Sequence, residues 1–212
     1  MGLNSNQQAD LKELGWCRFS LSETGSSVEE LCASLGFIIY ITEVKPKHNA
    51  KGLVTSLKPL AFHTDHSRAD FVAWYCHSQS ETGGETILTD AVCAFDKLTD
   101  SDKSALKKVL LYEHKIFPDD PEQTPFVDLS KGIPEIYFSY WFAEDIVDPA
   151  TKNALQSFKS YLEASPKVRF RMIPGDFLIV NNKRMLHSRT QISDSERHLT
   201  RYWIEKPKAN LK

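Results

Sequence analysis

The sequence lacks an apolar run long enough to cross a membrane. Its longest, residues 35–41, falls far short of the about 20 residues that a membrane-spanning helix needs. An excess of basic charge is also absent, because 26 Lys and Arg residues stand against 28 Asp and Glu residues, for a net charge of −2. Glycine and proline are scarce, at 9 and 10 of 212 residues, and 41% of the residues are hydrophobic. These features exclude disordered and fibrous classes, and we expect neither a membrane nor a nucleic acid as partner.

The cysteines form neither a metal-binding motif nor a dense disulfide framework. There are four, and none of them stands in a C-x-x-C pair, which favours free thiols in a reducing cytoplasm. The polar N-terminal residues 1–15 lack the apolar core of an export signal, so we expect a cytoplasmic protein. A chain of this length can bury a core by itself, and we expect residues 1–212 to form a single domain.

Hydrophobic spacing and capping signals predict three helices and eight strands. Helix start and stop signals are a serine before an acidic turn, a proline in the first turn and a glycine after the last turn. The strands are short apolar runs bounded by turn residues. The predicted helices span residues 27–35, 101–111 and 149–164. The predicted strands span residues 37–41, 60–65, 71–76, 85–89, 168–173, 176–180, 184–190 and 198–204.

Strands at both ends of the chain, with helices between them, favour a mainly β fold with flanking helices (α+β). We expect a β-sandwich or barrel with core strands in about residues 37–90 and 168–205, and a helical, proline-rich insertion at about residues 96–165. Within the insertion, residues 117–134 hold four prolines and four acidic residues. Two interpretations of this segment stay open: a solvated connection, or a lid or substrate loop.

The tripeptide His63-Thr64-Asp65 lies in a predicted strand. Side chains alternate along a strand, so we expect His63 and Asp65 to share one face. An imidazole and a carboxylate are two of the three ligands of a two-histidine, one-carboxylate site, which leaves positions open on Fe(II) for a co-substrate and O₂. His187, far along the chain, can supply the second histidine through tertiary folding. The alternative is that His187 is an ordinary core or surface histidine.

Arg201 lies on the predicted strand at residues 198–204 and Arg197 stands directly before it, and in strand geometry the two share a face. Guanidinium groups inside a barrel need anions as partners, and arginine binds carboxylates through two parallel hydrogen bonds. This face could therefore bind a dicarboxylate and a second anionic group. The alternative is that both arginines are solvated surface charges. His66, which follows Asp65, either lines the same pocket or lies on the surface, depending on where its strand ends.

Four segments, in this order along the chain, carry a resemblance to a known family: HTD at 63–65, GGET at 83–86, GDFLIVNNKRMLHSR at 175–189 and RHLTR at 197–201. The sequence resembles the taurine dioxygenase/clavaminate synthase-like oxygenases. These enzymes depend on Fe(II) and 2-oxoglutarate and fold as a double-stranded β-helix, or jelly roll. The resemblance implies this fold for the chain, with Fe(II) as its metal and with 2-oxoglutarate and O₂ as co-substrates.

The resemblance also assigns roles to individual positions of this chain. Arg197 would bind the distal carboxylate of 2-oxoglutarate, and Thr86 would donate a hydrogen bond to the same carboxylate. Arg201 would bind an acidic group of the primary substrate, whose pocket His66 could line. The implied iron ligands are His63, Asp65 and His187. Aromatic candidates for the pocket walls, with core packing as the alternative, are Trp74, Tyr75, Tyr140, Trp141 and Trp203.

The function that the resemblance implies is oxidation of an unactivated C–H bond, most often hydroxylation, in a small molecule such as an amino acid or other carboxylate. Succinate and CO₂ would be released. Asp65 stands where halogenating relatives have a small residue, which argues against halogenation. Residues 181–182 read Asn-Asn where the family commonly has Asp-Asn. Two alternatives stay open: an oxygenase of protein or RNA side chains, and a metal-binding jelly roll with isomerase, hydrolase or ligand-sensing activity and no O₂ chemistry. Primary substrate, type of oxidation and oligomeric state are not predicted.

Overall fold

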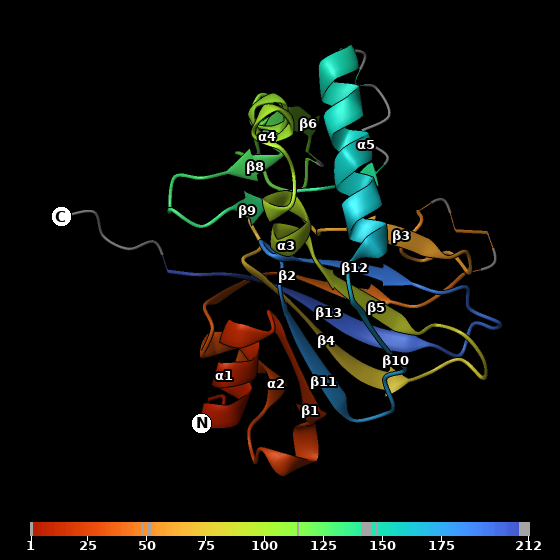
Figure 1. Ribbon diagram of the computed structural model, residues 1–212. Helices are drawn as coiled ribbons and strands as arrows, with labels where there is room; N and C mark the ends of the chain where they lie inside the picture. The colour runs from red at the N-terminus through yellow and green to blue at the C-terminus, as the bar shows by residue number, and fades with distance from the viewer. Residues whose placement is uncertain are drawn as a thin grey trace.

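Two antiparallel β-sheets form the centre of the molecule (Figure 1). The computed structural model describes residues 2–47, 49–50, 52–113, 115–140, 146 and 148–207. The five-stranded sheet contains, in spatial order, β1 (Trp16–Ser20), β11 (Asp176–Asn181), β4 (Phe71–Ser78), β13 (His198–Glu205) and β2 (Phe37–Val44). The four-stranded sheet contains β10 (Lys167–Phe170), β5 (Thr86–Asp90), β12 (Met185–Arg189) and β3 (Leu60–His63). In both sheets the paired strands come from distant parts of the chain, as in a jelly roll, which confirms the predicted mainly β fold.

Apolar side chains from both sheets fill the space between them. Trp74 on β4, Leu178 on β11 and Leu88 on β5 belong to one buried cluster. Side chains of this size each stabilise the fold by about 1.5–3 kcal/mol when they are fully buried. Because side chains alternate along a strand, β4 and β11 send Ala73 and Ile179 to the opposite, outer face of the five-stranded sheet.

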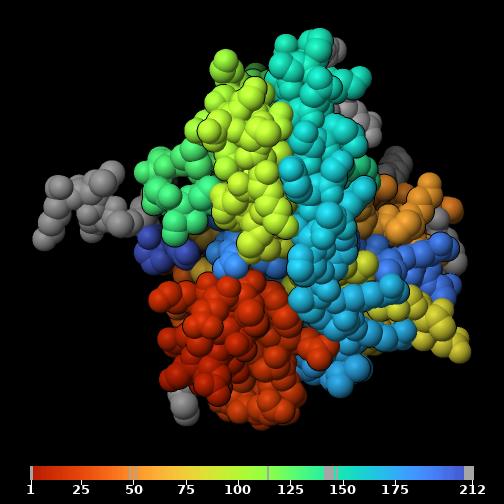
Figure 2. Space-filling view, viewed as in Figure 1, coloured from red at the N-terminus to blue at the C-terminus, as the bar shows by residue number. Residues whose placement is uncertain are grey.

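The N-terminal segment covers that outer face. It forms α1 (Ser5–Glu13), β1, a 3₁₀ turn η1 (Leu21–Glu23) and α2 (Val28–Ala33), and Leu31 of α2 packs in the same cluster as Ala73. Figure 2 shows this segment as one red mass on the lower side of the molecule. The sequence predicts α2 but not α1. Only Gln7 and Leu11 of α1 are buried, so its apolar spacing is too sparse to reveal a helix.

The chain between β5 and β10 forms a second layer at the other end of the molecule (Figures 1 and 2). Its helix α5 packs against the shorter helices α3 and α4. Phe126, Phe138 and Phe158 meet edge-to-face in its core. The helices are α3 (Ala91–Asp96), α4 (Asp100–Leu106) and α5 (Pro149–Ala164). The short strands are β6 (Leu110–Tyr112), β7 (Gln123–Pro125), β8 (Val127–Asp128) and β9 (Glu135–Ile136).

The predicted helix at residues 101–111 is wrong in its second half. α4 ends at Leu106, and the chain continues into β6, which pairs with β7. Within β6, Leu111 is buried whereas Leu110 and Tyr112 are exposed. The apolar residues after Leu106 therefore follow the period of a strand, which a short window cannot distinguish from that of a helix. The predicted strand at residues 60–65 likewise ends earlier, at His63.

The structure also bears on two further expectations, one about the cysteines and one about membrane-spanning helices. The four cysteines are free thiols, as predicted, and three of them are buried in the core. Among the described residues, no helix is both long enough and apolar enough to traverse a membrane.

Candidate metal centre

β3 and β12 place two histidines side by side. His63 is the last residue of β3 and is paired with His187 of β12, and their ring centroids lie 4.3 Å apart. Asp65 follows two residues after His63. Its Oδ1 is 3.9 Å from Nε2 of His63 and 3.8 Å from Nε2 of His187. All three side chains are buried. The structure thus brings together the three residues that the sequence singles out as candidate metal ligands.

Asp65 reaches this position from a turn and not from a strand. The expectation that strand alternation aligns it with His63 is wrong, because β3 ends before Asp65. Instead, the backbone N–H of Asp65 donates to Oδ1 of Asn182 at 2.8 Å, and the N–H of Thr64 donates to the carbonyl of Phe138 at 2.8 Å. Nδ2 of Asn182 also donates to the carbonyl of Ala69 at 2.9 Å. Asn182 therefore holds the turn that presents Asp65, a role that the sequence did not reveal.

The three side chains offer two neutral nitrogens and one anionic oxygen. Burial lowers the pKa of His63, and burial together with the neighbouring His63 lowers the pKa of His187 to about 3. Nδ1 of His63 lies 2.8 Å from the carbonyl of Ala61, to which it donates, so the lone pair of Nε2 faces Asp65. Burial acts to raise the pKa of Asp65, but the guanidinium of Arg201 holds it below its usual range. This donor set fits a divalent transition metal.

Arg201 and Trp203, both on β13, hold the carboxylate of Asp65. Nη1 of Arg201 donates to Oδ1 of Asp65 at 2.8 Å, and Nε1 of Trp203 donates to Oδ2 at 2.9 Å. Arg201 is only 8% exposed, so the alternative of a surface charge is wrong for this residue. Its buried Nε has no partner among the described residues, which leaves it a donor for a further ligand. The contact between Arg201 and Asp65 was not predicted.

A basic cavity adjoins the two histidines. It is lined by Thr86, Arg189 and Arg197 together with His63 and His187. Burial and the neighbouring Arg189 lower the pKa of Arg197 to about 9, and the structure shows no hydrogen bond or ion pair from Arg197 to any described residue. Arg197 is 4% exposed, so it too is no surface charge. A buried guanidinium without a partner is costly, and the cavity is therefore suited to an anion.

Arg189 is a second cation of this cavity, which the sequence analysis did not identify. Its guanidinium donates to the backbone carbonyls of Val54, Ser56 and Lys58 at 2.7–2.9 Å. Burial lowers its pKa to about 10. Carbonyl oxygens accept from its Nη1 and Nη2 groups without neutralising its charge. Arg189 therefore adds positive potential beside Arg197 and fixes the 54–58 segment over the cavity.

Gly84 makes room for Arg197. Its φ of 72° lies in the left-handed region, and a Cβ atom at this position would stand 3.3 Å from Cδ of Arg197 and 2.8 Å from Oε1 of Gln79. The N–H of Gly84 donates to the carbonyl of Gln191 at 3.0 Å. Only glycine combines this conformation with so close an approach. Gly83 and Gly84, which precede β5, thus let the start of this strand pack closely against the segment that runs from Gln191 to Arg197.

A second cavity, of about 280 Å³, lies on the other side of the three candidate ligands. His63 and Arg201 line both cavities, so the candidate metal centre stands between them. His66 lines the second cavity with a buried side chain, and its Nε2 is 3.1 Å from Oδ2 of Asp120. The alternative of a surface histidine is wrong, because β3 ends before His66 and the chain turns inward.

An acidic group from the helical layer completes the second cavity. Oε1 of Glu113 accepts a hydrogen bond from the hydroxyl of Tyr137 at 2.9 Å, and its Oε2 accepts one from the N–H of Ser67 at 3.1 Å. Among the aromatic candidates, Trp74 lines the first cavity and Trp203 lines the second. Tyr75 packs on the outer face of the five-stranded sheet and Tyr140 against the helical core. Trp141 lies outside the described residues.

Comparison with known proteins gives a family and a set of structural relatives. The sequence model of the family described as "Taurine catabolism dioxygenase TauD, TfdA family" matches residues 33–203. Two curated relatives are the gamma-butyrobetaine dioxygenases of Homo sapiens and Pongo abelii, each 25% identical over 223 aligned positions that cover 89% of this chain and 57% of the relative. The chain thus spans little more than half the length of these relatives.

Solved structures share the fold. An asparagine oxygenase in complex with Fe(II), 2S,3S-3-hydroxyasparagine and succinate superposes with a TM-score of 0.74 at 18% identity, over 94% of this chain and 78% of that chain. The non-heme iron oxygenase OrfP in complex with Fe and alpha-ketoglutaric acid gives a TM-score of 0.71 at 15% identity, over 97% of this chain and 81% of that chain. At such identities the likeness establishes the jelly-roll fold alone.

Proposed function

Since the chain belongs to the TauD, TfdA family, we propose that it is an Fe(II)- and 2-oxoglutarate-dependent oxygenase that hydroxylates a small carboxylate-bearing molecule, such as an amino acid. O₂ would be consumed, and succinate and CO₂ released. The observation that carries the proposal is the buried cluster of His63, Asp65 and His187 between a cationic cavity and a second, larger one. Relatives described as dioxygenases, and a structural neighbour bound to Fe(II) and a hydroxylated amino acid, support it.

In this proposal His63, Asp65 and His187 hold the iron. When bound, iron supplies the activation of O₂ and of 2-oxoglutarate, which no side chain provides. The chain contributes position and charge: neutral imidazoles, an ionised carboxylate and a turn fixed by Asn182. The hydrogen bonds around the three ligands orient them before the metal binds, which is the role of the residues that surround a metal site.

Arg197 binds the distal carboxylate of 2-oxoglutarate, and Thr86 donates a hydrogen bond to the same group. The support for this step is that Arg197 is buried beside Arg189 with no acidic partner among the described residues, in a cavity that also contains the two histidines. A planar guanidinium binds a carboxylate through two parallel hydrogen bonds. The anion would offset the cost of burying two cations together.

We also propose which part of the chain binds the metal and co-substrate and which part shapes the substrate cavity. It acts as one domain, in which the β core at about residues 37–90 and 168–205 holds the metal and the co-substrate. The insertion at about residues 96–165 shapes the substrate cavity, because Glu113 and Tyr137 come from it. Free cysteines and a net charge of −2 suit a cytoplasmic enzyme of small molecules that has no nucleic-acid partner.

The proposed substrate group beside Arg201 gives a prediction. Arg201→Ala should raise the KM for the primary substrate about tenfold or more, because a hydrogen bond to a charged group contributes about 1.5–3 kcal/mol. Oxidation of 2-oxoglutarate without substrate should stay measurable, since Arg197 and the histidines are unchanged and Trp203 still holds Asp65 after the contact with Arg201 is lost. Parallel assays of succinate and of hydroxylated product check this. An unchanged substrate KM would remove Arg201 from the substrate site and leave it only its contact with Asp65.

A screen for succinate formation tests the proposed function. Purified protein is supplied with Fe(II) and 2-oxoglutarate in air, together with individual amino acids and small carboxylates, and products are identified by mass. Succinate formation that rises with one substrate class, together with a product heavier by one oxygen atom, is the expected result. Absence of succinate with every substrate, in protein that still binds metal, would favour a metal-binding jelly roll without O₂ chemistry.

A further inference from the structure

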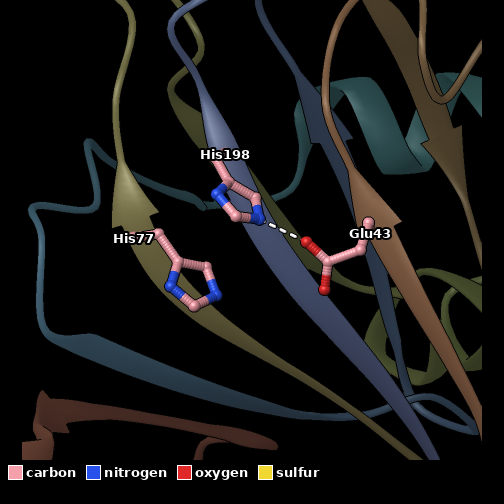
Figure 3. A group of neighbouring side chains, drawn as sticks. All are labelled: Glu43, His77 and His198. Atoms are coloured by element: carbon pink, nitrogen blue, oxygen red, sulfur yellow. Dashed lines mark hydrogen bonds and ion pairs between the residues drawn. The ribbon is translucent and has the colours of Figure 1, made fainter.

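A second cluster of metal-ligating side chains lies on the outer face of the five-stranded sheet. Glu43 of β2, His77 of β4 and His198 of β13 each offer one ligand atom, and these atoms lie within 4.8 Å of one another (Figure 3). Side chains alternate along β13, so His198 points away from the cavity that its neighbours Arg197 and Leu199 line. The cluster is therefore separate from the candidate metal centre between the sheets.

Strand register explains why these three residues meet. Thr200 of β13 is paired with Glu43 on one side and with Tyr75 on the other. Between the pairs Leu199–Cys76 and His198–Ser78, β4 has one extra residue, His77. Such a bulge redirects side chains, and here it lays the ring of His77 against that of His198, with centroids 4.1 Å apart and planes 19° apart. The strand register and the bulge therefore determine where these three side chains lie.

Hydrogen bonds hold the carboxylate and one imidazole of this outer cluster in place. Oγ1 of Thr200 donates to Oε1 of Glu43 at 2.8 Å and lies 2.8 Å from Nε2 of His77. Nε2 of His198 contacts Oε2 of Glu43 (Figure 3). A competing cation is present as well, because Nζ of Lys45 stands 4.0 Å from Oε2 of Glu43. At that distance, between half-exposed groups, the ion pair contributes little.

The charge state of the outer cluster suits a cation. Partial desolvation and the neighbouring His198 lower the pKa of His77, which favours its neutral form. Desolvation acts to raise the pKa of Glu43, but hydrogen bonds from His198 and Thr200 hold it below its usual range. Two stacked imidazoles beside a carboxylate thus offer two nitrogen ligands and one negative charge, the set that Zn²⁺ prefers, and the metal would displace the protons that Nε2 of each histidine now donates to Thr200 and Glu43.

We propose that Glu43, His77 and His198 bind a Zn²⁺ ion on the outer face of the sheet, with water as the fourth ligand. Tetrahedral zinc with bonds of about 2.0–2.1 Å needs ligand atoms about 3.4 Å apart, so the cluster must contract slightly. The carboxylate of Glu43 is 53% exposed and can move to do this. Zinc would join the edge strand β2 to β13 and β4, and so would brace the strand that carries Arg201 and that directly follows Arg197.

Zinc titration of metal-free protein against a chromophoric chelator tests this proposal. Wild-type protein should bind two Zn²⁺, because the cluster of His63, Asp65 and His187 offers a similar donor set. His187→Ala should keep one tight Zn²⁺. The double variant His77→Ala/His198→Ala should lose the outer ion, with its affinity falling by more than about tenfold, and should retain succinate formation. Lys45→Ala is the matched control, since it alters a neighbouring charge but no ligand.

Further variants distinguish zinc binding at the outer cluster from zinc binding elsewhere on the protein. In the His187→Ala background, adding His77→Ala and His198→Ala should abolish the remaining tight binding, and zinc should no longer raise the Tm. Both results would support the outer site. Two results would overturn it: equal zinc affinity and stoichiometry in wild type and in His77→Ala/His198→Ala, or no tight zinc in His187→Ala. The three side chains changed outside the metal centre, those of Lys45, His77 and His198, are all at least partly exposed, so the variants should fold.

Discussion

His187→Ala should abolish succinate formation while the protein stays folded. His187 lies in the middle of β12, paired with His63, and its Nε2 faces Oδ1 of Asp65 at 3.8 Å. Removal of a residue that merely supports a metal ligand costs about 10–100-fold in affinity or activity, and removal of a ligand should cost more. We therefore expect turnover below detection at saturating 2-oxoglutarate and Fe(II), measured as succinate over time.

Two controls separate this effect from unfolding. The variant should give the circular dichroism spectrum of the wild type and a cooperative thermal transition, because Nδ1 of His187 makes no hydrogen bond that the substitution would break among the described residues. His198→Ala removes a histidine of β13 on the outer face and should leave turnover intact. Turnover retained in purified, metal-loaded His187→Ala would remove His187 from the proposed iron site.

Arg197→Ala should raise the KM for 2-oxoglutarate by about 100-fold or more. Each hydrogen bond between charged groups contributes about 1.5–3 kcal/mol, and a guanidinium forms two with a carboxylate. The structure gives Arg197 no other partner among the described residues, so the loss should fall on the ligand and not on the fold. The measurement is succinate formation against 2-oxoglutarate concentration, with kcat and KM determined separately.

Matched variants sharpen the assignment of Arg197. Arg197→Lys keeps a positive charge but only one donor group, and it should recover part of the affinity. Arg169→Ala removes an arginine of β10 whose side chain is 60% exposed and contacts Glu85, and it should leave the KM unchanged. If Arg197→Ala bound 2-oxoglutarate as wild type does, the co-substrate carboxylate would lie elsewhere, with Arg189 as the next candidate.

Much of the fold could be predicted because local patterns and tertiary structure agree in the core strands. The apolar runs around Phe71 and Asp176 became β4 and β11 with ends shifted by one or two residues. The prediction failed where tertiary contacts decide the structure. α1 buries only two side chains, and β6 gains its strand character by pairing with β7, which no local window contains.

The candidate site was also predicted only where local sequence patterns reveal it. The motif around His63 and Asp65, the later His187 and the arginine pair Arg197 and Arg201 could be found because each stands in a recognisable pattern, and the structure brings them together. Residues that hold them were missed. Asn182, Arg189 and Glu113 act through contacts across long stretches of chain, and an Asn, Arg or Glu alone carries no sequence signal of such a role.

The central claim is that the three buried ligands and Arg197 together bind Fe(II) and 2-oxoglutarate. An anaerobic visible spectrum tests it most directly, because a chelated co-substrate on Fe(II) gives a weak metal-to-ligand charge-transfer band. We expect the band in wild-type protein only when both components are present. It should be absent in His187→Ala and should require much more 2-oxoglutarate in Arg197→Ala. A band of equal strength in wild type and His187→Ala, or none in wild type at saturating concentrations of both components, would contradict the claim.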